Sequence, residues 1–202
     1  MVKIVNGRKK YGPLDLVAPV VYHALNECYH MSYNGTDKLK GLDKGVVLFP
    51  NHQSGMDIIV EGVLVNRFLG RDGYYLMKKS LPRWLEIIGG IPTTRGEGGV
   101  SAVRNAYSRT QEALREGNVV VTHIQKTRSV GEFDVSSAGS QLRKFLRIQG
   151  ELGVEVPFVP LEIEYEGFSL GSEISVNVRD PIVTENLVDL EAHLRSEVGV
   201  FV

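Results

Sequence analysis

Cysteine is nearly absent from this chain, and neither sign of charge dominates. Cys28 is the only cysteine in 202 residues, which excludes an intrachain disulfide and a thiolate metal cluster and suits a reducing compartment. Lysine and arginine number 23 against 24 aspartates and glutamates, so the formal net charge is −1. This balance creates no global field that gathers nucleic acid, so no nucleic-acid partner is expected and any anion site must be local.

Long apolar runs are also lacking. The longest, Leu16 to Tyr22, contains Pro19 and is far shorter than the roughly 20 residues that span a bilayer. Residues 1–10 are polar and basic, and the segment after them lacks the small-residue cleavage pattern of a signal peptide. We therefore expect a cytoplasmic protein that does not cross a membrane.

The sequence lacks the signatures of two common enzyme classes. The glycines from Gly96 to Gly99 are without the lysine and the serine or threonine of a phosphate loop, which argues against a kinase. Ser54 lacks the Gly-x-Ser-x-Gly elbow and stands only two residues from its supposed base, His52. A serine hydrolase that uses Ser54 as nucleophile is therefore a weak alternative.

Apolar residues recur with helical and strand periods in alternation along the chain. The expected helices are 13–32, 56–69, 81–88, 100–115, 140–151 and 187–198, and the expected strands are 46–49, 73–77, 119–121, 156–165 and 174–178. Residues 89–99 and 131–139 are expected to form loops. This order predicts a single α/β domain with a mixed, mostly parallel sheet flanked by helices, in which the last two strands can pair antiparallel.

The first 44 residues are expected to form an N-terminal amphipathic helix and a connector, followed by the main domain over residues 45–202. The helix begins at Pro13 and carries an apolar stripe, which predicts packing against the protein's own domain. The alternative is an interfacial helix that lies on a bilayer, and the segment around Trp84 is a second candidate for such a contact.

The stretch from Val46 to Asp57 organises the candidate site. An apolar run ends in a polar turn that carries His52 and, five residues later, Asp57. On one continuous helix these side chains would point about 140° apart, whereas a strand, a turn at Gly55 and a helix start let them meet. A neutral imidazole can then take a proton from a hydroxyl while the carboxylate holds its other nitrogen. The alternative is a helix capping box, in which Ser54 caps and Asp57 has a purely structural role.

Two later loops each contribute an arginine to the candidate site. Arg95 lies in the glycine-rich segment, and Arg128 follows the expected strand 119–121. Ligands of open α/β sheets bind outside the carboxyl ends of the strands, so we expect both arginines to converge with His52 on a phosphate-bearing alcohol. A surface salt bridge is the alternative for either arginine alone.

Four short blocks of sequence occur in a fixed order along the chain, and their combination is specific. They are residues 51–57 (NHQSGMD), 89–95 (GGIPTTR), 127–129 (TRS) and 156–160 (VPFVP). This series resembles the glycerolipid acyltransferase family, and most closely the lysophosphatidate acyltransferases, over about residues 45–183. The resemblance implies that His52 is the general base and that Asp57 holds and polarises it. It further implies that substrate is bound by Arg95, Gln125, Lys126, Thr127, Arg128 and Ser129.

The reaction implied by this resemblance moves a fatty acyl chain from a thioester to a hydroxyl without an acyl-enzyme. The donor would be acyl-CoA or acyl carrier protein as co-substrate, and the acceptor a lysophospholipid or a glycerol phosphate. No bound cofactor and no metal is implied. Because acceptor and product are membrane lipids, peripheral association with a membrane surface is expected, and residues 45–202 would form the acyltransferase domain.

The third block departs from the family pattern, which usually reads Phe-Pro-Glu-Gly-Thr-Arg-Ser. Residues 123–129 read HIQKTRS here, so Gln125 replaces a charged glutamate and Lys126 adds a cation where the family has glycine. A more anionic acceptor, reduced activity or a non-catalytic phospholipid-binding homologue would each explain this change. His123 is interpreted as a packed or hydrogen-bonded residue rather than a second base.

Overall fold

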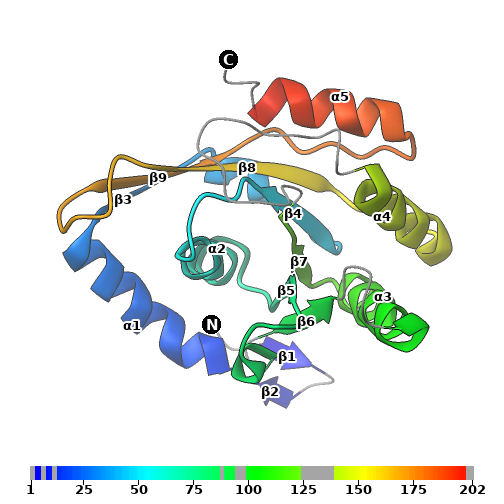
Figure 1. Cartoon of the computed structure of the whole chain (residues 1–202), viewed down its shortest axis with the longest axis horizontal. Helices are drawn as coiled ribbons and strands as arrows, with labels where there is room; N and C mark the ends of the chain where they lie inside the picture. Colours follow the sequence, from blue (N-terminus) through cyan, green and yellow to red (C-terminus); the bar gives the residue numbers. More distant parts are fainter. Residues whose placement is uncertain are drawn as a thin grey trace.

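Within the part of the chain that the structure describes, seven strands form one sheet, and helices pack against it (Figure 1). The computed structural model describes residues 3–5, 8–10, 13–86, 89–93, 99–123 and 139–198, and within them the strand order is β3-β9-β8-β4-β7-β5-β6. The strands are β3 (His30–Asn34), β4 (Val46–Pro50), β5 (Gly73–Lys78), β6 (Gly90–Thr93), β7 (Val119–Val121), β8 (Phe158–Tyr165) and β9 (Glu173–Val178). All neighbours pair parallel except β8 and β9, which are antiparallel. The predicted α/β class is confirmed, including the antiparallel pairing of the last two strands.

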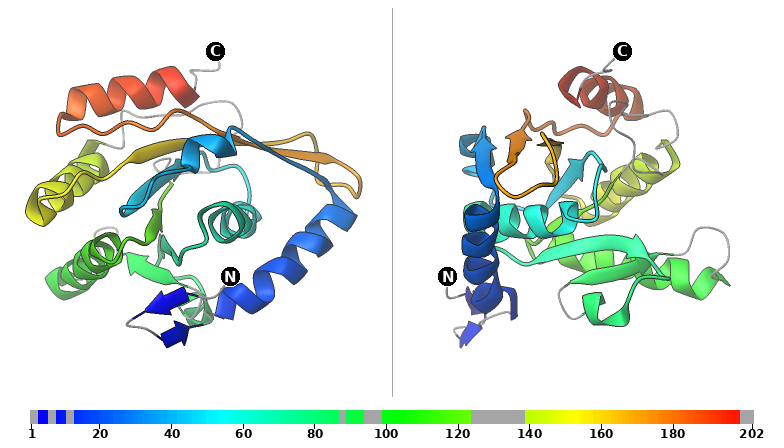
Figure 2. Two further views of the ribbon diagram at one scale, coloured as in Figure 1. Left: turned by 180° about the vertical axis from the view of Figure 1, so that it is seen from behind. Right: turned by 60° about the vertical axis from the view of Figure 1, so that its left-hand side comes forward.

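Helices cover both faces of this sheet. They are α1 (Pro13–Cys28), α2 (Asp57–Leu64) with its π-helical continuation η2 (Val65–Leu69), α3 (Gly99–Arg115), α4 (Gly139–Leu152), α5 (Leu187–Val198) and the 3₁₀ helices η1 (Thr36–Leu39) and η3 (Arg83–Glu86). Figures 1 and 2 show α1 and α2 on one side of the sheet and α3, α4 and α5 on the other. Two separate hydrophobic clusters fill the two interfaces.

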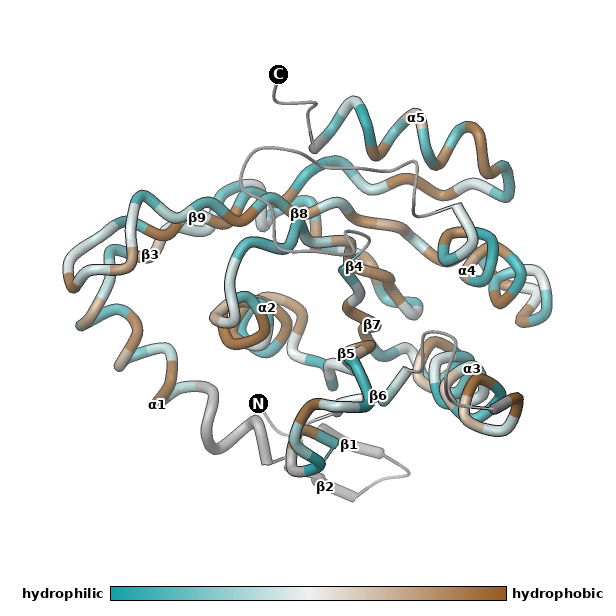
Figure 3. Tube along the Cα trace, in the orientation of Figure 1, coloured by the Kyte–Doolittle hydropathy of each residue, from teal (hydrophilic) through white to brown (hydrophobic). Residues whose placement is uncertain are grey.

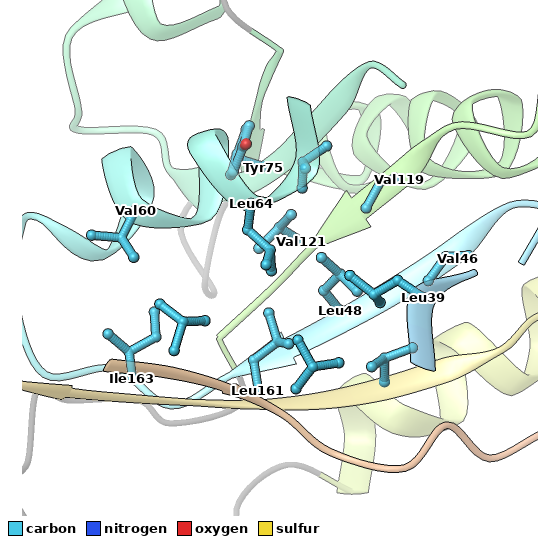
Figure 4. Packing of buried hydrophobic residues seen from close by; sticks show 14 of the residues in the cluster. Leu39, Val46, Leu48, Val60, Leu64, Tyr75, Val119, Val121, Leu161 and Ile163 are labelled. Carbon is cyan, nitrogen blue, oxygen red and sulfur yellow. The ribbon is translucent and has the colours of Figure 1, made fainter. Parts of the chain in front are cut away.

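Strand β4 is buried on both faces, which explains its unbroken apolar run. Val46 and Leu48 belong to the cluster beneath α2, where Figure 4 shows them in one packed layer with Leu64. Val47 and Phe49 belong to the cluster beneath α3, α4 and α5. Because β4 is hydrogen-bonded to β7 on one edge and β8 on the other, the turn that follows it has a defined position at the carboxyl edge of the sheet.

Short strands account for the main errors of the sequence-based prediction. The helix expected over 13–32 is wrong in its last part, because α1 ends at Cys28 and residues 30–34 form β3 against β9. The loop expected over 89–99 is wrong at its start, because residues 90–93 form β6 against β5. A hairpin of β1 (Lys3–Val5) and β2 (Arg8–Lys10) was also not anticipated. Such short segments become strands because a distant partner supplies their hydrogen bonds. The domain boundary at residue 45 stays a prediction.

The first helix packs only partly. Leu25 is buried, whereas Val20 of the expected apolar stripe is 68% exposed. α1 contacts α2, η2 and β3. Over the described ranges, no helix combines the length and the apolar character that a membrane span requires.

Candidate active site

Asn51 ties the turn after β4 to the neighbouring strand. Its side-chain Nδ2 donates to the carbonyl of Ile163 at 2.9 Å, and its Oδ1 accepts the backbone N–H of Ile163 at 2.7 Å. A buried side-chain amide thus continues the pairing between β4 and β8 one residue past the end of β4. Asn51 opens the motif at 51–57, but the sequence alone does not indicate this role.

The turn brings His52 and Asp57 into direct contact. Nδ1 of His52 lies 2.9 Å from Oδ2 of Asp57. The His52 side chain is 24% exposed and the Asp57 side chain is 1% exposed, so the imidazole is reachable while the carboxylate is enclosed. The structure therefore places the two residues as the catalytic interpretation requires, although their roles remain predictions.

Asp57 accepts hydrogen bonds from four donors, which together stabilise its ionised form. Oδ2 also accepts the backbone N–H groups of Gln53 at 2.9 Å and Ser54 at 3.0 Å, and Oδ1 accepts the hydroxyl of Tyr165 at 2.6 Å. Burial opposes ionisation, but the hydrogen bonds from His52, Tyr165, Ser54 and Gln53 outweigh it and lower the pKa of Asp57. An ionised carboxylate only accepts, so Nδ1 of His52 must carry a proton, and in the neutral ring Nε2 is the basic nitrogen.

The capping-box alternative describes half of this turn. Asp57 does reach back to the N–H of Ser54, as a capping box requires. However, the hydroxyl of Ser54 accepts the N–H of Met56 at 3.1 Å, and α2 has no side-chain cap at its start. Asp57 thus orders the turn and holds His52 at the same time.

Tyr165, at the end of β8, is a member of this site that the sequence does not indicate. Burial and the hydrogen bond to Asp57 both raise the pKa of its hydroxyl, which therefore stays a proton donor at neutral pH. Tyr165 and Asp57 are 108 positions apart, so no local pattern could have joined them.

Tyr165→Phe is expected to lower the free energy of unfolding by about 1.5–3 kcal/mol, the range for a hydrogen bond to a charged group. If about 1.4 kcal/mol of this hydrogen-bond free energy also stabilises the transition state, the variant turns over about tenfold more slowly. The matched control is Tyr107→Phe, which removes a similar bond to Glu151 on the surface and should leave turnover unchanged. Denaturant unfolding and turnover, measured on both variants, check this expectation, and equal behaviour of the two would contradict it.

A second imidazole–carboxylate pair stands beside the first. Nε2 of His123, two residues past β7, lies 2.7 Å from Oε1 of Glu61 on α2. The rings of His52 and His123 are 4.3 Å apart between centroids. The expectation that His123 is hydrogen-bonded is confirmed. Glu61 was not singled out, although a lone charge in the apolar run of α2 could have drawn attention to it.

Three of these side chains can approach one cation. The potential ligand atoms of His52, Asp57 and His123 all lie within 4.8 Å of one another.

The other predicted site residues lie outside the described part of the chain. They are Arg95, Gln125, Lys126, Thr127, Arg128 and Ser129. The strands that lead to them are described: β6 ends at Thr93, and β7 pairs directly with β4. The carboxyl ends of these parallel strands lie at the same edge of the sheet as the turn that carries His52.

Comparison with known proteins supports this fold. The sequence matches no family model and no curated protein. Among solved structures, the 1-acyl-sn-glycerophosphate (LPA) acyltransferase PlsC from Thermotoga maritima is similar over 91% of this chain and 75% of its own, with a TM-score of 0.60 and 18% sequence identity. Together with the arrangement of the sheet and its helices, this similarity shows that the chain has the fold of that acyltransferase.

Proposed function

We propose that this protein transfers a fatty acyl chain from a thioester to a hydroxyl of a lysophospholipid or a phosphorylated glycerol. The observation that carries the proposal is the contact of 2.9 Å between Nδ1 of His52 and the enclosed carboxylate of Asp57, at the carboxyl edge of a sheet with an acyltransferase fold. The sequence motif at 51–57, which contains both residues, also supports the proposal.

In the proposed reaction, Nε2 of His52 takes the proton of the acceptor hydroxyl as its oxygen attacks the thioester carbonyl. Asp57 keeps the other nitrogen protonated and stabilises the imidazolium that forms. The tetrahedral intermediate collapses by breaking the carbon–sulfur bond, and the departing thiolate takes the proton back from His52. The products are an ester and a free thiol, and the enzyme returns to its starting state.

The acceptor's phosphate is proposed to bind Arg95 and Arg128, with Lys126 adding a further positive charge. Residues 127–129 follow β7 in the sequence, and β7 is the immediate neighbour of β4, the strand that leads to His52. Arg95 follows β6, which stands three strand positions from β4, or about 14 Å at the usual spacing of about 4.8 Å. A guanidinium can bind two phosphate oxygens at once, which would orient the hydroxyl toward His52.

The assay that tests this proposal follows thiol release from palmitoyl-CoA and from palmitoyl-acyl carrier protein, with lysophosphatidate or glycerol 3-phosphate as acceptor. Mass spectrometry identifies the acylated product. We expect acceptor-dependent thiol release with one of the two donors. Binding of lysophosphatidate without thiol release from either donor would instead support the alternative, a non-catalytic phospholipid-binding homologue.

A lipid acceptor also requires contact with a lipid surface, and we propose that the turn between β8 and β9 makes it. Phe168 is 62% exposed and Leu170 is 80% exposed. The ring of Phe168 stacks on Tyr165 at 5.2 Å, so this turn adjoins the partner of Asp57. The backbone N–H of Gly171 donates to the carbonyl of Cys28, which places the turn at the end of α1, as Figure 1 also shows.

Replacing both Phe168 and Leu170 with serine is expected to reduce binding to vesicles of phosphatidylcholine and phosphatidate, because each side chain loses about 1.5–3 kcal/mol of possible apolar burial. The control replaces Val183 and Val188 with serine; both are exposed and lie elsewhere on the surface. Co-sedimentation measures the bound fraction. Equal binding by the two double variants would exclude this turn as the contact.

A further inference from the structure

His52 and His123 form an unusual pair, because each imidazole is held by its own buried carboxylate. Asp57 holds His52 at 2.9 Å, and Glu61 holds His123 at 2.7 Å. The side chain of Glu61 is fully buried, and those of the two histidines are only 24% and 20% exposed. Histidines that bind metal are commonly oriented by a carboxylate on the other ring nitrogen, and Glu61 holds His123 in this way.

We infer that His52, His123 and Asp57 form a binding site for a divalent first-row transition metal, with Zn²⁺ as the best match. Two nitrogens and one carboxylate oxygen suit Zn²⁺ better than Mg²⁺ or Ca²⁺, which prefer oxygen ligands. Three protein ligands leave a fourth position for water or a substrate group. The inference departs from the sequence-based expectation that no metal is involved.

The distances allow such a site after small side-chain movements. The three potential ligand atoms lie within 4.8 Å of one another, and ligands of a tetrahedral Zn²⁺ at about 2.1 Å stand about 3.4 Å apart. Rotations that move these atoms by about one ångström would therefore close the set around a cation. The cation would take the place of the proton between Nδ1 of His52 and Oδ2 of Asp57. His123 lies two residues past β7, the strand paired with β4, at the same edge of the sheet.

The charges around the site also favour a cation. Asp57 contributes one carboxylate as a ligand, and Glu61 contributes a second behind His123. Oε2 of Glu61 is buried and has no hydrogen-bond partner among the described residues. A buried carboxylate is costly unless positive charge compensates it. A divalent cation on His123 would compensate both carboxylates.

The consequence of metal binding rests on the proposed function. A cation bound to a ring nitrogen of His52 or to its partner Asp57 disables the pair that is proposed to take the proton from the acceptor hydroxyl. Zn²⁺ would therefore inhibit acyl transfer reversibly. The sequence change that places His123 where the acyltransferase family has an aromatic residue would make this protein metal-sensitive.

Binding is tested on the full chain after dialysis against EDTA, by calorimetric titration with Zn²⁺ and by the visible absorption of Co²⁺ as a tetrahedral probe. Wild type is expected to bind one ion per chain. His123→Gln and His52→Gln should each weaken binding by more than about 100-fold, and Glu61→Gln by about tenfold, as for outer partners of metal ligands. His23→Gln is the matched control, because His23 is exposed on α1 and is not one of the three proposed ligands.

Wild type that binds no Zn²⁺, or His123→Gln that binds it as tightly as wild type, would overturn the inference. Circular dichroism confirms the fold of each variant, and His52→Gln decides the matter if His123→Gln does not fold. In the thiol-release assay, Zn²⁺ should inhibit at the concentration at which it binds, and EDTA should reverse the effect. The binding result stands even if no acyl transfer is found, so the two proposals can fail separately.

Discussion

His52→Gln is expected to reduce the rate of acceptor-dependent thiol release by about 10²- to 10⁴-fold, the usual contribution of a general base. Glutamine keeps an N–H that can donate to Asp57, so the turn should retain its shape, but it has no nitrogen basic enough to take a proton. Thiol release under saturating donor and acceptor measures the effect, and the affinity for lysophosphatidate is measured separately.

The control for this variant is His193→Gln. His193 lies on α5 and donates to the carbonyl of Asp180 on the surface, so its loss should leave the rate unchanged. Because His52 is partly exposed, its own substitution should change the unfolding midpoint little. A folded His52→Gln protein with wild-type turnover would refute the general-base role, even if the acyl-transfer activity itself were present.

Asp57→Asn is expected to impair both turnover and stability. The carboxylate serves four donors with two oxygens, whereas an asparagine side chain has one acceptor oxygen and an NH₂ group that faces donors. A donor left without an acceptor costs about 1–3 kcal/mol of unfolding free energy. Loss of the charge that stabilises the imidazolium should lower turnover by about 10²- to 10⁴-fold, with the geometry of His52 disturbed as well.

The pH dependence of the free energy of unfolding gives a second test of the Asp57→Asn variant. The folded pKa of Asp57 is lowered from its ordinary value of 3.8. The carboxylate therefore stabilises the fold above that pH and loses this contribution as the pH falls through the lower folded pKa. Below pH 3.8, the free energy of unfolding, measured with denaturant, should fall more steeply with decreasing pH in wild type than in Asp57→Asn.

Asp180→Asn is the matched control, because its pKa is also lowered, chiefly by a hydrogen bond from Lys38, but it lies on the surface. Its turnover should equal that of wild type. If Asp57→Asn and Asp180→Asn had the same activity and the same acid dependence, Asp57 would have neither of the two roles assigned to it.

The local sequence was enough to predict the strands whose residues are all apolar and buried. The run over 46–49 and the three valines of 119–121 predict strands, and both are fully buried in the sheet. The contact of His52 with Asp57 was also predictable, since five residues across a strand, turn and helix start leave few ways for the two side chains to lie. The reason is physical: short loops restrict geometry, and periodic apolar residues define which face is buried.

Only the tertiary structure decided which distant residues complete the site. Tyr165 meets Asp57 across 108 positions, and His123 meets Glu61 across 62. Strands β3 and β6 likewise form because β9 and β5 offer hydrogen bonds to segments with weak intrinsic preference. These contacts depend on strand order, which arises from the packing of the whole chain. The sequence by itself could therefore indicate a base and its carboxylate, but the second histidine pair and the tyrosine at the carboxylate required the folded sheet.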